Sequence, residues 1–230
     1  MTTANATFDA PVAFDYRRID LENWADVYVV GDVHGCLEEL EQLLSKLELG
    51  EDDLAIFVGD LVRKGPESLA VLDRVSSSSS LVSVRGNNEQ KLLAGDASLA
   101  SFGAAEHRYV ESLPTVIAWD GGLVVHGGVD PNRPLADHAP EALLTMRAPD
   151  GDGYDGPFWF DEYRGPPRVF FGHTVLERPF ESEWAIGLDT GCVYGGSLTA
   201  YDVRREEFVS VSARGHVERS AENIVAVEQR

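Results

Sequence analysis

Short apolar runs recur along the chain, and a polar residue with ligand chemistry follows each of them closely. The runs, each with that polar residue, are DVYVV (Asp32), LAIFV (Asp60), LVSV (Asn87), LVV (His126) and VFF (His173). Continuous apolar runs of this length predict strands that are buried on both faces. Five predicted strands would therefore present Asp, Asn or His at their carboxyl ends.

Helical patterns separate the first three runs. The segment CLEELEQLLSKLEL places leucines on one helical face, at Leu37, Leu40, Leu43, Leu44 and Leu47. The segment ESLAVLDRV follows Pro66, which suits the first turn of a helix. The five serines at 76–80 then predict a solvated connection. Alternating strands and helices predict parallel strands joined by crossover helices, with ligands bound outside the carboxyl ends.

The pattern changes beyond about residue 180 to closely spaced strand-like runs without helices between them, AIGLD, SLTAYDV and EFVSVSA. These runs predict antiparallel strands that form or complete a second sheet. The length of 230 residues and the apolar content of 43% suit one domain over 1–230. Its core is expected over about residues 26–213, the span of the predicted elements.

The polar residues at the strand ends are typical of metal ligands. Asp32 and His34 are one residue apart in GDVHG, where a glycine-flanked turn can direct both side chains toward one ion. Asp60 could bridge that ion to a second ion. The remaining ligands of the second ion would be Asn87, His126 and His173. This mixture of nitrogen and oxygen donors suits Mn, Fe or Zn better than Ca or Mg. Two such ions can clamp a phosphoryl group and hold a hydroxide for in-line attack.

Each candidate ligand also has an ordinary structural interpretation. Alone, Asp32 or Asp60 would more often be a turn or cap residue, and Asn87 a turn residue. A single interior histidine is more often a hydrogen-bonded core residue than a ligand. Three of the six histidines, however, lie beside glycine near predicted strand ends, which favours a shared site. The other three, His107, His138 and His216, lack this context and are expected at the surface.

The charge balance and the apolar pattern exclude some classes of partner. The chain has 19 basic and 39 acidic residues, a net charge of −20, and its only lysines are Lys46, Lys64 and Lys91. Such a chain offers no basic patch for a nucleic-acid backbone. No apolar run approaches the roughly 18 residues of a membrane span, and MTTANATFDAP lacks the features of a leader. We therefore expect a cytoplasmic protein without a membrane partner.

The two cysteines, Cys36 and Cys192, lie far apart in the sequence and form no C-x-x-C motif. They indicate neither a zinc ribbon nor a disulfide framework. We expect both to be small buried side chains.

The acidic, lysine-poor composition predicts a halophilic source, against the alternative of a merely acidic mesophilic protein. Repulsion among excess carboxylates destabilises the folded chain in dilute buffer, and molar salt screens it within about 3 Å. We therefore expect the free energy of unfolding, measured by denaturant titration, to increase from about 0.1 M toward molar salt. Maximal stability below about 0.1 M salt would contradict the halophilic interpretation.

The motifs GDVHGC, GDLVRKGP, RGNNE, VVHGG and FGHT resemble, in this order, those of the calcineurin-like metallophosphoesterases, over roughly Val27 to Val203. The similarity is to the branch of phosphoprotein phosphatases and symmetrical diadenosine tetraphosphatases. The segments GDVHGCLEEL and GLDTGCVYGGSLTAYDV are more similar to the tetraphosphatase side. The resemblance implies an α/β fold of two packed mixed β-sheets flanked by helices, with a two-metal centre at the strand ends. It assigns Asp32, His34 and Asp60 to one metal, and Asp60, Asn87, His126 and His173 to the other.

The resemblance also implies cationic groups that hold phosphate oxygens. Lys64 stands where the family has an arginine, which keeps the charge but loses the bidentate guanidinium. Arg147, in LLTMRAP, is the candidate for a second clamp, with a surface salt bridge as its ordinary alternative. Arg63 either reaches the phosphate or is solvated.

One pair of residues departs from the family pattern. In phosphoprotein phosphatases a histidine follows the amide ligand and, oriented by an aspartate, protonates the leaving oxygen. Asn88 stands in place of that histidine, and Arg63 in place of the aspartate. A serine alkoxide needs such a proton, which usually contributes about 10²–10⁴-fold, whereas a phosphoanhydride releases a stable phosphate anion.

The sequence therefore predicts a metal-dependent hydrolase with two divalent ions, Mn first and Fe or Zn as alternatives. The expected substrate is a dinucleoside polyphosphate or a related nucleotide or polyphosphate. The alternative is a serine/threonine protein phosphatase acting on phosphoproteins. A further alternative is a non-catalytic, metal-bearing sensor of phosphate or nucleotide, which a metal-supplemented p-nitrophenyl phosphate assay would distinguish from an enzyme.

Overall fold

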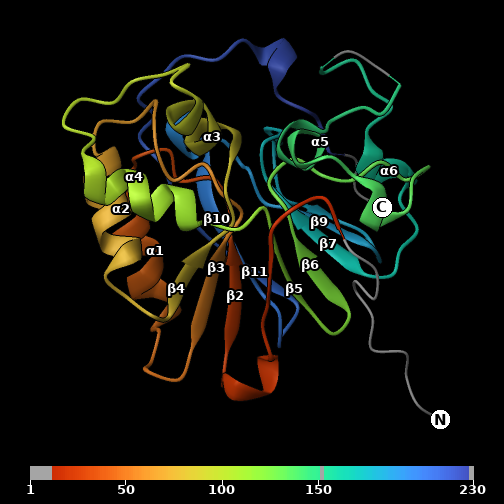
Figure 1. Ribbon diagram of the computed structural model, residues 1–230, viewed down its shortest axis with the longest axis horizontal. Coiled ribbons are helices and arrows are strands. Elements are labelled where there is room, and N and C mark those ends of the chain that lie inside the picture. The colour runs from red at the N-terminus through yellow and green to blue at the C-terminus, as the bar shows by residue number, and fades with distance from the viewer. Residues whose placement is uncertain (1–11, 151–152, 228–230) are drawn as a thin grey trace.

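The apolar runs that precede the polar residues form strands of two β-sheets, which pack face to face (Figure 1). The computed structural model describes residues 12–150 and 153–227. Residues 1–11, which contain the segment expected to lack a leader, lie outside this range. Within the described residues, no helix is long and apolar enough to cross a membrane. The cytoplasmic location and the extent of the domain stay predictions.

Each sheet contains both parallel and antiparallel pairs. In order across the first sheet lie β11 (Glu207–Ser212), β10 (Ser197–Asp202), β2 (Val27–Val30), β3 (Leu54–Phe57) and β4 (Leu81–Ser83). In order across the second lie β1 (Tyr16–Arg18), β5 (Val116–Trp119), β6 (Gly122–Val124), β7 (Arg168–Phe171), β9 (Ala185–Gly187) and β8 (Phe180–Glu181). The predicted fold of two packed mixed sheets is therefore confirmed.

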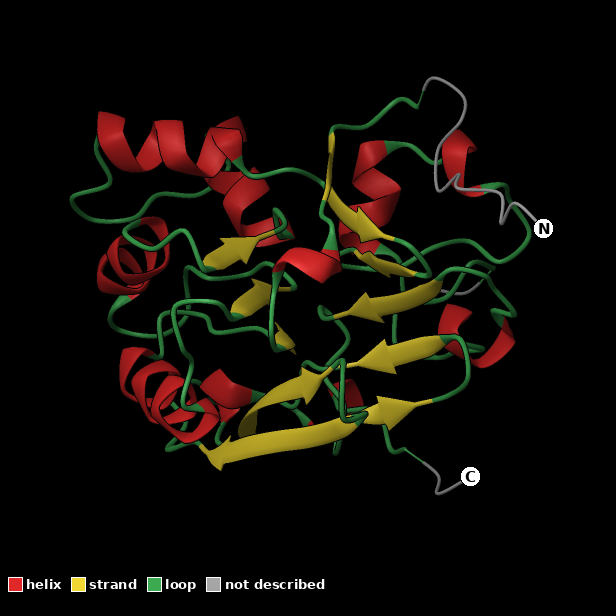
Figure 2. Ribbon diagram, turned by 90° about the horizontal axis from the view of Figure 1, so that it is seen from below, coloured by secondary structure: helices red, strands yellow, loops and turns green. Residues whose placement is uncertain are grey.

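Helices flank both sheets (Figure 2). The α-helices are α1 (Leu37–Leu47), α2 (Ser68–Ser76), α3 (Asn87–Ala94), α4 (Ala104–Ser112), α5 (Pro140–Thr145) and α6 (Trp159–Glu162). Short 3₁₀ turns are η1 (Leu21–Asn23), η2 (Leu135–Asp137), η3 (Cys192–Tyr194) and η4 (Ala221–Asn223). The predicted leucine face of α1 and the serine connection between α2 and β4 are confirmed.

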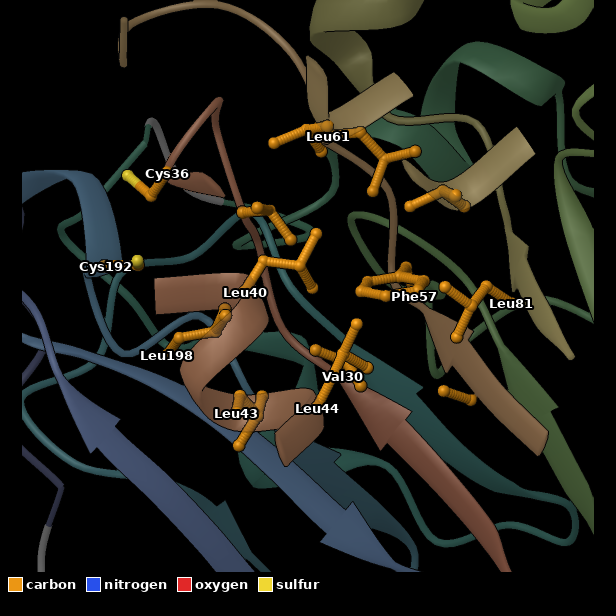
Figure 3. Packing of buried hydrophobic residues seen from close by; sticks show 14 of the residues in the cluster. Val30, Cys36, Leu40, Leu43, Leu44, Phe57, Leu61, Leu81, Cys192 and Leu198 are labelled. Atoms are coloured by element: carbon orange, nitrogen blue, oxygen red, sulfur yellow. The ribbon is translucent and has the colours of Figure 1, made fainter. Parts of the chain in front are cut away.

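Alternation along the strands fills a core on each side of the first sheet. Val27 and Val29 of β2 pack into the core between the sheets, whereas Tyr28 and Val30 pack into the core under the helices. This is the two-residue period expected of a strand. Leucines of α1 and residues of β2 and β3 share the outer core (Figure 3). Burial on both faces explains why the runs are continuously apolar.

The late strands differ from the prediction in their pairing. The strands β10 and β11 are antiparallel, as predicted, but β10 pairs with β2 and completes the first sheet. In contrast, β9 pairs parallel with β7 in the second sheet. Pro66 lies in the turn before α2, not in its first turn, because Ser68 is the first helical residue.

The two cysteines are buried, as predicted, with 1% of Cys36 and 2% of Cys192 exposed. The packing of η3 against the start of α1 nevertheless brings the two sulfurs and the Glu39 carboxylate within 4.8 Å of one another. Both thiols are free.

Candidate metal centre

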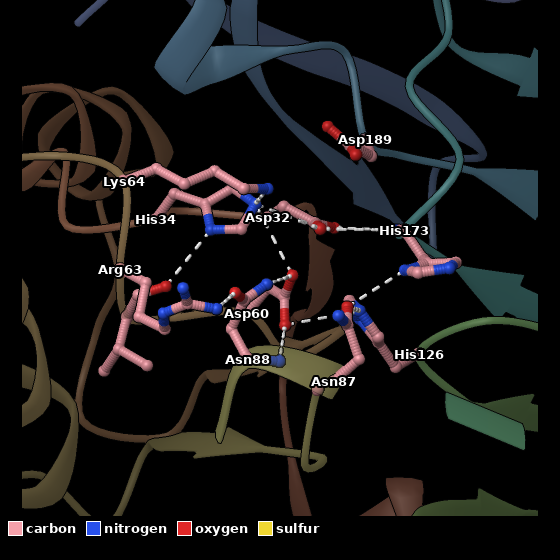
Figure 4. Close-up of polar contacts among 12 residues, drawn as sticks. Asp32, His34, Asp60, Arg63, Lys64, Asn87, Asn88, His126, His173 and Asp189 are labelled. Atoms are coloured by element: carbon pink, nitrogen blue, oxygen red, sulfur yellow. Dashed lines mark hydrogen bonds and ion pairs between the residues drawn. The ribbon is translucent and has the colours of Figure 1, made fainter. Parts of the chain in front are cut away.

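Strand ends from both sheets bring the predicted ligands together (Figure 4). Asp32 follows β2, Asp60 follows β3, and Asn87 begins α3 just after β4. His126 follows β6 and His173 follows β7 in the second sheet. The site therefore lies where the carboxyl ends of parallel strands meet, as expected for α/β sheets.

Three of the predicted ligands have left-handed backbone conformations, with φ of 51° at His34, 50° at Asp60 and 64° at His173. Residues other than glycine adopt this region rarely, and surrounding contacts must offset its cost. The His34 N–H donates to Asp60 O at 2.8 Å, and the His173 N–H lies 3.3 Å from each carboxylate oxygen of Asp32. These contacts hold the turns that direct the side chains toward one another.

Four atoms converge at the predicted second-metal position. Asn87 Oδ1 lies 3.0 Å from His126 Nε2 and 3.0 Å from His173 Nδ1. Asp60 Oδ1 lies 3.3 Å from His126 Nε2. Adjacent ligands bound at about 2.1 Å from one ion lie about 3.0–3.4 Å apart. The observed separations therefore fit one ion held by these four residues.

The hydrogen bond of His126 Nδ1 shows that Nε2 of the same ring faces the predicted second-metal position. Nδ1 lies 2.8 Å from Val58 O, which can only accept, so Nδ1 carries a proton. In the neutral ring, Nε2 then turns its lone pair toward the oxygens of Asn87 and Asp60, an arrangement that only a proton or a cation stabilises. Burial lowers the pKa of His126, but the charge and hydrogen bond of Asp60 outweigh burial and raise it to about 9. The donor set therefore suits a divalent cation.

Asp32, His34 and Asp60 form the second group of candidate ligands, with their donor atoms within 4.8 Å of one another. His34 Nε2 lies 3.5 Å from Asp60 Oδ2 and 3.9 Å from Asp32 Oδ2. His34 Nδ1 lies 3.1 Å from Val62 O, which leaves Nε2 as the acceptor that faces the carboxylates. Burial lowers the pKa of His34 to about 4, which keeps the ring neutral, the form that binds metals.

The two carboxylates have opposite pKa shifts. Burial, together with the neighbouring Asp189, raises the pKa of Asp32 well above its usual value. Burial acts in the same direction on Asp60, but the charge and hydrogen bond of His126 outweigh it and hold the pKa of Asp60 well below its usual value. Asp60 contacts both ligand groups and keeps its negative charge between them, as a bridging ligand requires.

Glu89, which the sequence analysis did not single out, fixes the loop that carries Asp60. Its buried carboxylate accepts from the backbone N–H groups of Asp60 (2.9 Å), Val62 (3.1 Å) and Gly86 (2.8 Å). Burial, followed by the charge of Asp60, raises the pKa of Glu89 to about 7. Its position two residues after the amide ligand, in RGNNE, was the available signal.

Glycines at two positions let the backbone approach the carboxylates. A Cβ at Gly172 would lie 2.0 Å from Asp32 Oδ1, and one at Gly86 would lie 2.2 Å from Asp60 Oδ1. Both separations are far below van der Waals contact, so any side chain there would displace a ligand.

Asn88 and Arg63 form a contact pair beside Asp60 (Figure 4). The Asn88 N–H donates to Asp60 Oδ1 at 2.9 Å, and its side-chain amide donates to Asp60 Oδ2. Arg63 Nη1 donates to Asn88 Oδ1 at 2.6 Å. The two residues that replace the acid pair of the family pattern are therefore in direct contact, because the Arg63 guanidinium is hydrogen-bonded to the Asn88 side chain.

The predicted phosphate-binding cations flank the ligands. Lys64 Nζ donates to His34 Nε2 at 2.7 Å, and Arg147 Nη2 donates to His173 O at 3.2 Å. Among the described residues, no carboxylate forms an ion pair with Arg147, so the salt bridge considered for it is not observed.

Asp189 is a further acidic residue at the site that sequence analysis missed. It follows β9, is 3% exposed, and accepts from the Gly191 N–H at 3.1 Å. Burial raises its pKa, and the positive charge of Lys64 acts against this increase. The run AIGL ends in Asp189, so the same strand-end pattern that identified the ligands was the signal for it.

One of the histidines expected at the surface is not there. His138 is only 1% exposed, its Nε2 accepts from the Asp130 N–H at 2.7 Å, and its Nδ1 lies 3.1 Å from Pro134 O. It closes the loop before α5, a role that depends on loop packing and leaves no periodic signal. His107 and His216 are exposed, as predicted.

The sequence profile of the calcineurin-like phosphoesterases matches residues 25–218. The chain belongs to this family. Its members use a dinuclear centre of divalent metals, and the grouped Asp32, His34 and Asp60 are a candidate part of one. This calcineurin-like phosphoesterase is therefore a hydrolase of phosphoric ester or anhydride bonds.

Known proteins similar to this phosphoesterase include both kinds of enzyme expected from the sequence. It is 30% identical over 205 residues to serine/threonine-protein phosphatase 1 of Salmonella typhimurium, covering 80% of this chain and 94% of the relative. It is 30% identical over 227 residues to the asymmetrical bis(5'-nucleosyl)-tetraphosphatase PrpE of Anoxybacillus flavithermus, covering 80% and 92%. The crystal structure of a candidate diadenosine tetraphosphatase superposes with a TM-score of 0.79 at 32% identity, covering 87% and 98%.

Proposed function

We propose that this phosphoesterase hydrolyses phosphoanhydrides, dinucleoside polyphosphates first among them, with related nucleotides and polyphosphate as further substrates. The proposed ligands of its two divalent ions are Asp32, His34, Asp60, Asn87, His126 and His173. Relatives named as dinucleoside tetraphosphatases support this choice.

The contact pair of Asn88 and Arg63 is the observation that carries the proposal. The amide hydrogens and oxygen of Asn88 are directed to Asp60 and Arg63, and a carboxamide has no acidic proton near neutral pH. The residue at position 88 therefore cannot protonate the leaving group, which must depart without a proton from Asn88. A phosphate anion can do so readily, whereas a serine alkoxide cannot.

The remaining residues have roles that follow from their contacts. When bound, the ions would supply positive charge and an activated hydroxide, with Mn as the expected metal and Fe or Zn as alternatives. Lys64 and Arg147 would hold phosphate oxygens, a role that their contacts with His34 and His173 support. Asn88 and Glu89 hold Asp60 and its loop in position.

A substrate panel with Mn, at high and low salt, tests the proposal. We expect kcat/KM for diadenosine tetraphosphate and tripolyphosphate to exceed that for phosphoserine peptides by about 10²-fold or more, the usual contribution of a proton donor. Equal or higher kcat/KM on phosphoserine peptides of several sequences would contradict it.

The observation that supports the alternative, a serine/threonine protein phosphatase, is the similarity to the Salmonella enzyme. The same panel distinguishes the two. A sensor without turnover would bind Mn and the nucleotides but hydrolyse none of the substrates, including p-nitrophenyl phosphate.

A further inference from the structure

A strip of alternating cations and tyrosines runs beside the metal centre. It consists of Lys64, Tyr194, Arg219, Tyr154 and Arg147, here called the cation–tyrosine strip. Successive cation-to-ring distances along it are 5.3, 4.7, 5.2 and 4.8 Å. At one end of the strip Lys64 is hydrogen-bonded to His34, and at the other end Arg147 is hydrogen-bonded to His173. The middle of the strip is Arg219, which the sequence analysis did not identify.

The segment after β11 carries Arg219 to this place. The His216 N–H donates to Val193 O in η3 at 2.7 Å, and the Val225 N–H donates to Val175 O at 2.8 Å. Val175 lies two residues beyond His173. The segment is therefore fixed between η3 and the loop of a proposed metal ligand, with Arg219 between these two anchors.

Three hydrogen bonds hold the Arg219 guanidinium and leave two of its five N–H donors for a ligand. Nε donates to Asn223 O at 2.8 Å, Nη1 donates to Tyr194 Oη at 3.1 Å, and Nη2 donates to Tyr154 Oη. A guanidinium has five N–H donors, so one remains on each terminal nitrogen. Two such parallel donors form the fork that binds a phosphate group.

Ion pairing with carboxylates is a property in which the cations of the strip differ from many other basic residues of the chain. Carboxylates are abundant in a chain of net charge −20, and many arginines pair with them, namely Arg18, Arg74, Arg85, Arg133, Arg168, Arg205 and Arg214. In the described part of the chain, none of the ion pairs includes Lys64, Arg147 or Arg219. Asp60 and Asp189 interact electrostatically with Lys64, and Asp189 also with Arg219, without forming an ion pair. The three cations of the strip thus lie along one line without an ion-paired carboxylate, which favours an anionic ligand.

We propose that Arg219 forms a second phosphate subsite, which recognises substrates with at least two linked phosphate groups. Lys64 and Arg147 contact metal-ligand residues and so serve the phosphate that reacts. Arg219 is separated from each of them by a tyrosine ring, and so serves the next phosphate of the chain. This inference rests on the proposed function and specifies its substrate class.

The test compares inhibitors that carry one and two phosphorus groups. In the Arg219→Ala enzyme, the inhibition constant of methylenediphosphonate against p-nitrophenyl phosphate hydrolysis should increase about 10- to 100-fold, the value of a charge-assisted hydrogen bond. The inhibition constant of orthophosphate should change little. Tripolyphosphate and diadenosine tetraphosphate should both lose kcat/KM; a loss for the nucleotide alone would indicate recognition of the nucleoside and overturn the proposal.

Two matched variants separate recognition from folding. Arg219→Lys should recover part of the discrimination because it keeps the charge without the fork. Arg214→Ala removes an exposed arginine that pairs with Glu38 and should leave both inhibition constants unchanged. Equal weakening of methylenediphosphonate and orthophosphate in Arg219→Ala would show a structural role only and overturn the proposal.

The design also separates failure of the subsite from failure of the proposed function. If the wild-type protein hydrolyses no substrate, the proposed function fails. Calorimetric titration of the Mn-loaded protein with methylenediphosphonate then tests the subsite directly, through the affinity difference between the wild type and Arg219→Ala.

Discussion

Replacing Asp60 with asparagine should lower kcat/KM on p-nitrophenyl phosphate and diadenosine tetraphosphate by about 10³-fold or more, as when a residue central to catalysis is removed. Among the carboxylates that the structure describes, only Asp60 contacts both proposed ligand groups, through His34 and His126. Asparagine has nearly the same shape but no charge, and its amide group would face a histidine or Asn88. The Mn content of the purified protein, measured by mass spectrometry, should fall with the activity.

The matched control is Asp96→Asn, which removes one charge from an exposed position after α3. It should keep both activity and Mn content, and circular dichroism should show that both variants are folded. An Asp60→Asn protein with normal Mn content and less than about a 10-fold loss of kcat/KM would contradict the bridging role.

Restoring the acid pair in the double variant Arg63→Asp/Asn88→His should increase kcat/KM on alkyl phosphates by about 10²-fold or more, within the usual range of general acid catalysis. The two residues are already in contact at 2.6 Å, so an aspartate and a histidine at these positions can be expected to interact. Activity on phosphoanhydrides should change much less, because their leaving groups do not need the proton.

The single variants should gain less than the double variant. Asn88→His alone would leave the new histidine beside the Arg63 guanidinium, which disfavours its protonated form. Arg63→Asp alone would provide no acid. We expect the gain in the double variant to exceed the product of the single effects, measured as a mutant cycle on phosphoserine peptides. Unchanged activity on alkyl phosphates would mean that their leaving groups receive a proton elsewhere.

Local sequence patterns were enough to predict the strands and the candidate ligands at their ends. An apolar run followed by a turn is a local pattern, and burial on both faces requires it to be continuous, so Asp32, Asp60 and His126 could be placed from the chain alone. The same local rule extends to Asp189, at the end of β9. The replacement of the acid pair by Arg63 and Asn88 could also be recognised in the sequence, whereas the contact between Arg63 and Asn88 could not.

The way in which distant segments meet depends on tertiary packing and could not be predicted from local patterns. The pairing of β10 with β2, the approach of Cys192 to Cys36, and the burial of His138 depend on packing between elements or within a loop. The clearest case is Arg219, which is separated by 65 residues from Tyr154 and by 25 from Tyr194. Its neighbours are set by where the segment after β11 crosses the strand ends, and no periodicity in the sequence encodes that crossing. Local patterns therefore located the proposed metal ligands, whereas the surroundings that suggest a substrate class arose from the packing of the two sheets and the C-terminal segment.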